Sequence, residues 1–107
     1  MRYGAVVQSK MFVTDRDAQI DNAILGIGGE AGEILDYFKK LRHHPVNVRK
    51  TGQSIRDEIG DLLWYVAALN ELLFGDSLLN VARDNIRKLQ GRFPERYNTV
   101  DVETLSL

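Results

Sequence analysis

Apolar side chains recur between residues 20 and 41 at alternating steps of four and three. Because an α-helix completes a turn every 3.6 residues, this spacing predicts one long amphipathic helix. Thr14 is the expected N-cap, with Asp15 and Asp17 in a first turn where negative charge suits the helix dipole. Pro45 disfavours helical geometry before it, so the helix should end near Arg42. The apolar positions are Ile20, Ile24, Ile27, Ala31, Ile34, Phe38 and Leu41.

A second amphipathic pattern follows an aperiodic stretch, residues 42–53, that is typical of a loop. Ser54 and Asp57 form an acidic variant of the capping box, which predicts a helix start at Ser54. Gly75 is expected to end this helix in the glycine position that commonly follows a helix C-terminus. Its apolar face comprises Ile59, Leu62, Leu63, Val66, Leu69 and Leu73.

A third helix is predicted between a cap at Asp76 or Ser77 and a stop at Pro94. Leu79, Ala82, Ile86 and Leu89 share one side of it. The first fourteen residues fit either a short helix or an extended arm. Residues 98–107 form a tail with no clear helical period, compatible with a strand, an arm or disorder.

Three helices without a convincing strand predict an all-α fold, in one domain spanning residues 1–107. Three helices with wide apolar faces bury themselves poorly, and a second copy would complete a bundle. The sequence therefore predicts a helical bundle completed by oligomerisation.

Charge and cysteine content narrow the possible chemistry. The formal net charge is -1, which disfavours a binder of nucleic acid polymers. With no cysteine, any metal must be bound by oxygen or imidazole ligands, and oxygen ligands favour Mg²⁺ or Mn²⁺.

No apolar run approaches the roughly 20 residues of a membrane span, and the N-terminus lacks a signal-peptide pattern. A cytoplasmic location without membrane attachment is expected.

Two pairs of acidic residues flank the apolar stripes in mid-helix: Glu30 with Glu33, and Glu58 with Asp61. Residues three apart are neighbours on a helix, with Cβ atoms roughly 5–6 Å apart. Antiparallel packing through the stripes would bring the four carboxylates together. Two such charges repel by about 3 kcal/mol at an effective dielectric of about 20, and a divalent cation would reverse that sign. Spacing alone leaves two interpretations open, a metal site or two solvated faces.

Glycines surround the first acidic pair at positions 26, 28, 29 and 32, and Gly60 lies in the second. Each costs about 1 kcal/mol relative to alanine in a helix interior, so close approach of a backbone or a ligand is expected in return. Residues 26–31 also match the spaced-glycine dinucleotide fingerprint. That interpretation is rejected, because the preceding residues are helical and Glu30 would face a pyrophosphate.

Asn85, Lys88 and Arg92 share one face of the third helix, a pattern that suits phosphate binding or an ordinary solvated basic side. Trp64 fits a core position better than base stacking, whereas the Tyr65 hydroxyl lies one turn after Asp61 and within reach of a phosphate. His43 and His44 are too few for a zinc site, so their loop is expected to be solvated, with closure over an anion as the alternative.

Three segments resemble the MazG-like all-α nucleotide pyrophosphatases. They are Gly-Glu-Ala-Gly-Glu at 29–33, Glu-Ile-Gly-Asp-Leu-Leu-Trp-Tyr at 58–65 and Asn-Ile-Arg-Lys-Leu-Gln-Gly-Arg-Phe-Pro at 85–94. The resemblance covers roughly residues 20–97. It implies a MazG-like helical bundle, a homodimer or homotetramer, that uses Mg²⁺ to convert (deoxy)nucleoside triphosphates to the monophosphate and pyrophosphate.

The resemblance also implies roles for individual residues. Glu30, Glu33, Glu58 and Asp61 would bind the metal, with Glu30 or Glu33 as the catalytic base. Lys88 and Arg92, with Asn85, would hold the phosphates, and Tyr65 joins the expected substrate-binding residues because of its position after Asp61. Many relatives carry a further glutamate where this chain has Gly29, which leaves the general base and the metal count open.

Two other functions remain compatible with the sequence. One is a non-catalytic helical module that binds a nucleotide or a protein partner. The other is a related pyrophosphohydrolase acting on a phosphoribosyl compound.

Overall fold

The chain folds into helices without a strand in the part that the structure, a computed structural model, describes. It describes residues 1–43 and 48–107, with side chains from 1–43 and 52–107. The elements are α1 (Tyr3–Lys10), α2 (Arg16–His43), α3 (Val48–Phe74), α4 (Leu78–Arg92), α5 (Pro94–Tyr97) and the 3₁₀ turn η1 (Val102–Thr104). The predicted all-α fold is confirmed, and the first residues adopt the helical alternative.

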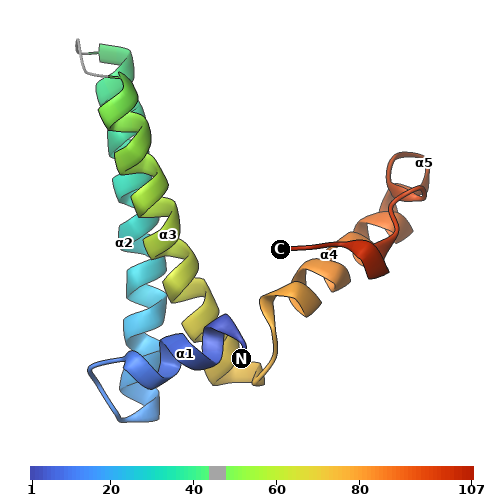
Figure 1. Cartoon of the computed structure of the whole chain (residues 1–107), viewed down its shortest axis with the longest axis horizontal. Coiled ribbons are helices and arrows are strands. Elements are labelled where there is room, and N and C mark those ends of the chain that lie inside the picture. The colour runs from blue at the N-terminus through green and yellow to red at the C-terminus, as the bar shows by residue number, and fades with distance from the viewer. Residues whose placement is uncertain (44–47) are drawn as a thin grey trace.

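The two longest helices, α2 and α3, pair as an antiparallel hairpin, and α1 crosses the base of α3 (Figure 1). The buried core lies at this base and is built largely from small or flexible side chains. Alanines allow helix axes to approach closely, and methionine fills irregular gaps. The core residues are Val7, Met11, Ala23, Ala67, Ala68 and Leu72.

Polar contacts tie the N-terminal segment to the end of α3. Arg2 donates to Glu71 at 2.6 Å and to the Gly75 carbonyl at 2.9 Å. Arg16 donates to the Leu72 carbonyl at 2.8 Å. The last carbonyls of a helix have no partner within the helix, so Arg16 supplies a donor to one of them, and Arg2 supplies one to the residue that follows the helix.

Both long helices begin differently from the prediction. The Asp15 carboxylate, rather than the Thr14 hydroxyl, accepts a hydrogen bond from the backbone N–H of Ala18 at 3.0 Å. Helix α3 begins at Val48, so Ser54 lies inside it and is not its cap. The predicted loop, residues 42–53, is therefore too long, although its residues 44–47 lie outside the described part. Contact with α2 supports helix where the local pattern favours a loop.

The other predicted boundaries are confirmed. Helix α2 ends at His43, one residue from the expected position. Gly75 follows α3 with φ 60°, a left-handed conformation that glycine adopts without a steric penalty. The Ser77 side chain caps α4 by accepting from the Asn80 N–H at 3.2 Å, and Pro94 begins α5 after α4 ends at Arg92.

The C-terminal tail is ordered along α4 rather than paired as a strand. Val102 in η1 is buried. Arg87 on α4 pairs with Glu103 at 2.9 Å, and Arg83 donates to the Glu103 carbonyl at 3.3 Å. The tail and α4 therefore form one unit at the end of the chain.

The predicted apolar stripes are buried only in part: Ile20 on α2 and Leu69 on α3 pack against the core. Ile24, Phe38 and Ile59 each expose half or more of their area, and Leu63 and Leu73 are also exposed. Helix α3 meets α2 with Asp61 beside Glu30 and Tyr65 beside Gly26, and its Ala68 shares the core with Ala23. Packing favours this arrangement because alanine and glycine permit a closer approach than leucine.

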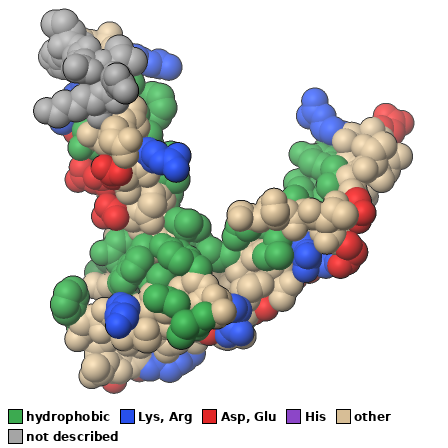
Figure 2. Space-filling model, viewed as in Figure 1, with side chains coloured by type: hydrophobic (Ala, Val, Ile, Leu, Met, Phe, Trp, Pro, Cys, Tyr) green, Lys and Arg blue, Asp and Glu red, His purple; other side chains and the backbone are tan. Residues whose placement is uncertain are grey.

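Helix α4 turns away from the hairpin, with a bend of 87° between it and α3 (Figure 1). The chain has a radius of gyration of 16.8 Å, whereas a compact domain of this length has about 13 Å. Its surface of 7873 Å² exceeds by roughly 1,800 Å² the area of a compact chain of this mass. Hydrophobic side chains gather around the open angle (Figure 2).

No single helix in the described residues combines the length and apolar character needed to cross a membrane. The bent pair formed by Gly52–Phe74 and α4 reaches these criteria only when its two helices are taken together.

Candidate metal centre

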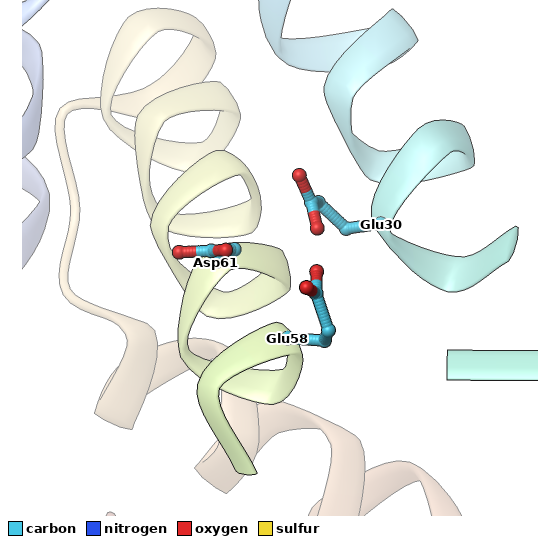
Figure 3. A group of neighbouring side chains, drawn as sticks. All are labelled: Glu30, Glu58 and Asp61. Carbon is cyan, nitrogen blue, oxygen red and sulfur yellow. The ribbon is translucent and has the colours of Figure 1, made fainter. Parts of the chain in front are cut away.

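Three carboxylates converge in the seam of the hairpin, one from α2 and two from α3. Oxygen atoms of Glu30, Glu58 and Asp61 all lie within 4.8 Å of one another. Glu58 and Asp61 are three residues apart, so both project from one side of α3. In Figure 3 the Glu30 and Glu58 carboxylates point toward one another from the two helices. The antiparallel register of α2 and α3 thus creates the cluster.

The cluster raises the pKa of Glu58 from 4.5 to about 7. The largest cause is a hydrogen bond with Glu30, followed by partial burial and by the negative charges of Glu30, Asp61 and Asp57. Each of these favours the protonated carboxyl. Asp57 was interpreted from the sequence as a capping residue, and its contribution to this negative field was missed.

One oxygen of Glu30, Oε2, is buried and has no hydrogen-bond donor among the described residues when the carboxylates are ionised. A proton on Glu58 supplies a donor, at the cost of neutralising one carboxylate. A buried charged oxygen without a donor is costly, and a bound cation satisfies it without protonating Glu58. The donor set therefore fits a hard cation.

No basic side chain of the described residues pairs with the cluster. The described ion pairs join Arg2 to Glu71, Lys40 to Asp36, and Arg87 to Asp84 and Glu103. None of them includes Glu30, Glu58 or Asp61. Within the described residues the compensation is a proton on Glu58, and a bound cation would supply the same positive charge.

An open cavity of about 310 Å³ adjoins the carboxylates and is lined by Glu30, Asp61, Trp64 and Tyr65. The two aromatic rings meet edge to face, with centroids 5.1 Å apart and planes at 82°, the geometry that aromatic pairs favour. Trp64 also packs against the buried core. It therefore combines the predicted core role with a wall of the cavity.

The remaining predicted site residues lie outside this group. Glu33 is exposed on the next turn of α2. Asn85, Lys88 and Arg92 are exposed on α4, which packs mainly against α5 and η1. His43 is exposed in the last turn of α2 and His44 lies outside the described residues. Within one chain the basic face and the carboxylates occupy separate parts of the molecule.

The fold and the cluster together define an all-α protein with a candidate oxygen-ligand cation site in a helical hairpin. The profile of the MazG nucleotide pyrophosphohydrolase domain matches residues 19–97, which include all but the first turn of the hairpin, together with α4 and α5. The chain belongs to this family. The Gene 37 protein of Mycobacterium phage L5 is 37% identical over 70 residues, which cover 64% of this chain and 60% of that protein. No solved structure matches significantly.

Proposed function

We propose that the protein hydrolyses (deoxy)nucleoside triphosphates to the monophosphate and pyrophosphate, with Mg²⁺ bound by Glu30, Glu58 and Asp61. One observation carries the proposal: three carboxylates converge around a buried, unpartnered glutamate oxygen in a chain of the MazG family. Carboxylate ligands favour Mg²⁺, and Mn²⁺ suits the same donors. Glu33 is the candidate fourth ligand, since a residue three positions after Glu30 is within reach of the same ion.

The bound cation would neutralise the triphosphate and orient the attacking water. The water oxygen forms a bond to the α-phosphorus, and the bond from that phosphorus to the bridging oxygen breaks. Pyrophosphate leaves with the electron pair of that bond. Glu30 or Glu33 accepts the proton that the water releases, because a carboxylate beside the water is positioned as a general base.

Substrate binding in this proposal combines the cavity with the basic face of α4. The Tyr65 hydroxyl donates to a phosphate oxygen beside the carboxylates. Lys88 and Arg92 bind the charge of the phosphates and of the leaving pyrophosphate, and Asn85 donates a further hydrogen bond. The bend of 87° holds α4 away from the hairpin of its own chain, so the basic face meets a cluster across a subunit interface.

We therefore propose a homodimer, or a homotetramer built from it. Apolar side chains on the open side of the hairpin supply the interface: Ile24 and Leu35 on α2 expose 53% and 71% of their area, and Ile59 on α3 exposes 53%. The excess surface of roughly 1,800 Å² is about twice what one partner buries in an ordinary interface. No nucleic acid polymer or membrane partner is part of the proposal.

The test is product analysis with a panel of standard and modified nucleoside triphosphates, a phosphoribosyl pyrophosphate-type compound and Mg²⁺. Monophosphate and pyrophosphate should accumulate, without diphosphate, and chelation should stop the reaction. Glu33→Ala and Asp61→Ala should abolish turnover while the circular dichroism spectrum stays helical. Asp21→Asn, an exposed acid of α2 outside the cluster, is the matched control and should retain activity.

Three results would contradict the proposal. Wild-type activity in Glu33→Ala or Asp61→Ala would remove these residues from the site. A nucleotide that raises the melting temperature without being turned over would indicate a sensor. Turnover restricted to the phosphoribosyl compound would indicate the related pyrophosphohydrolase.

A further inference from the structure

Gly26 is the glycine of α2 that meets a neighbouring side chain. A Cβ atom built on it would lie nearer than 3.0 Å to three ring carbons of Tyr65, a separation that real Cβ atoms essentially never show. Gly28, Gly29 and Gly32 have nothing within 4 Å of the same position in the described residues. The sequence predicts the approach of a backbone or a ligand, whereas the group that approaches Gly26 is a side chain, and the other three glycines are open toward the described residues.

The contact at Gly26 lies beside the candidate site. Gly26 is one turn before Glu30 on α2, and Tyr65 is one turn after Asp61 on α3. The Tyr65 ring is half-buried between them, and it lines the cavity with Glu30 and Asp61. Its edge-to-face contact with Trp64 fixes the second aromatic wall. The missing side chain at Gly26 thus provides the space that the ring occupies.

We propose that Gly26 is a positioning residue of the substrate cavity: it seats the Tyr65 ring against the backbone of α2, and thereby fixes the Tyr65 hydroxyl where it meets the nucleotide phosphates. This inference rests on the proposed function. Gly26 touches neither substrate nor metal and acts only through Tyr65. A methyl group at position 26 must displace the ring into the cavity or toward Trp64, because the helix backbone behind it does not yield.

The experiment compares Gly26→Ala with Gly29→Ala in the full-length protein. Gly26→Ala should lower kcat/KM for a nucleoside triphosphate at least tenfold, mostly through KM. Mn²⁺ affinity, measured by electron paramagnetic resonance without nucleotide, should stay within twofold, since the carboxylates keep their positions. Gly29→Ala adds the same methyl group on the same helix, where no described residue is within 4 Å, so its kcat/KM should stay within twofold.

A double-mutant cycle tests whether the effect passes through Tyr65. In a Tyr65→Ala background, Gly26→Ala should change kcat/KM less than twofold. The fluorescence of Trp64, the single tryptophan of the chain, gives a readout that needs no activity. Gly26→Ala should shift its emission, because the neighbouring ring moves, whereas Gly29→Ala should not.

The outcomes separate this inference from the proposed function. If the wild type turns over no nucleotide, the proposed function fails. The Trp64 emission then still tests the position of the Tyr65 ring, and an unchanged emission in Gly26→Ala would overturn it. Additive losses in the double mutant, or a parallel loss of Mn²⁺ affinity, would indicate general separation of the helices and overturn the inference. If Gly26→Ala does not fold, the double mutant Gly26→Ala/Tyr65→Ala should fold, since the overlapping ring is gone. A double mutant that also fails to fold would contradict the proposal.

Discussion

The open apolar side of the hairpin gives the sharpest test of the proposed assembly. Leu35 lies there on α2 and exposes 71% of its area in the single chain. If the chain acted alone, Leu35→Glu would be an ordinary surface substitution, worth less than about 0.5 kcal/mol. In a two-fold dimer the same substitution places two carboxylates in the interface, because symmetry repeats every change.

The expected loss follows from the burial of these charges. An unpaired charge buried in an interface costs about 3 kcal/mol, so two of them cost about 6 kcal/mol per dimer. Since about 1.4 kcal/mol changes an equilibrium constant tenfold, Kd for the dimer should rise by about four orders of magnitude. The variant should be monomeric at concentrations where the wild type is dimeric.

The assay is sedimentation equilibrium combined with thermal melts over a range of protein concentrations. The wild type should show twice the chain mass of 12.1 kDa, or a multiple of that, and a melting temperature that rises with concentration. Leu35→Glu should show the mass of one chain and lose that dependence. Asn22→Glu adds a charge at an exposed position on another side of α2 and should behave as the wild type. A wild-type mass of one chain, or an unaffected dimer in Leu35→Glu, would refute the reasoning.

Three further predictions concern pH, substrate binding and the core. The pKa of Glu58 is about 7 instead of 4.5, so between these pH values the folded, metal-free chain holds a proton that the unfolded chain has released. The melting temperature of the wild type should therefore fall relative to that of Glu58→Gln as pH rises from 4.5 to 7, and equal pH dependence of the two melting temperatures would contradict this. Lys88→Ala should raise KM for nucleotide at least tenfold while Mn²⁺ affinity, measured by titration, stays within twofold; equal losses would remove Lys88 from phosphate binding. Met11 is only 8% exposed, so Met11→Ala should lower the free energy of unfolding by about 2–5 kcal/mol in denaturant titrations. Phe12 is fully exposed, and Phe12→Ala should change that free energy by less than about 0.5 kcal/mol. Equal changes in the two variants would place α1 outside the cooperative fold.

Local sequence patterns determined the helices and the candidate ligands. Helical spacing identified α2 and α4 closely, because caps and stops such as Ser77, Gly75 and Pro94 act on neighbouring residues of the chain. The i,i+3 spacing of Glu58 and Asp61 placed both on one side of a helix before any partner was known. Residue spacing was also enough to single out the glycines of α2 for a close approach, although not which of them makes it.

Only the tertiary structure decided which faces meet. The leucine-rich stripe of α3 has the stronger apolar pattern, yet α3 meets α2 at Ala68 and Tyr65, because Ala23 and Gly26 on α2 leave room for a close approach. That arrangement brings Asp61 to Glu30, leaves Glu33 on the exposed turn beyond, and places Gly26, among the α2 glycines as far as the described residues show, under a ring. Helix α3 also begins at Val48 rather than at Ser54, since a packed neighbour stabilises helix where local propensity is weak. Such choices depend on contacts between residues about 30 to 50 positions apart, which periodicity within one helix does not encode.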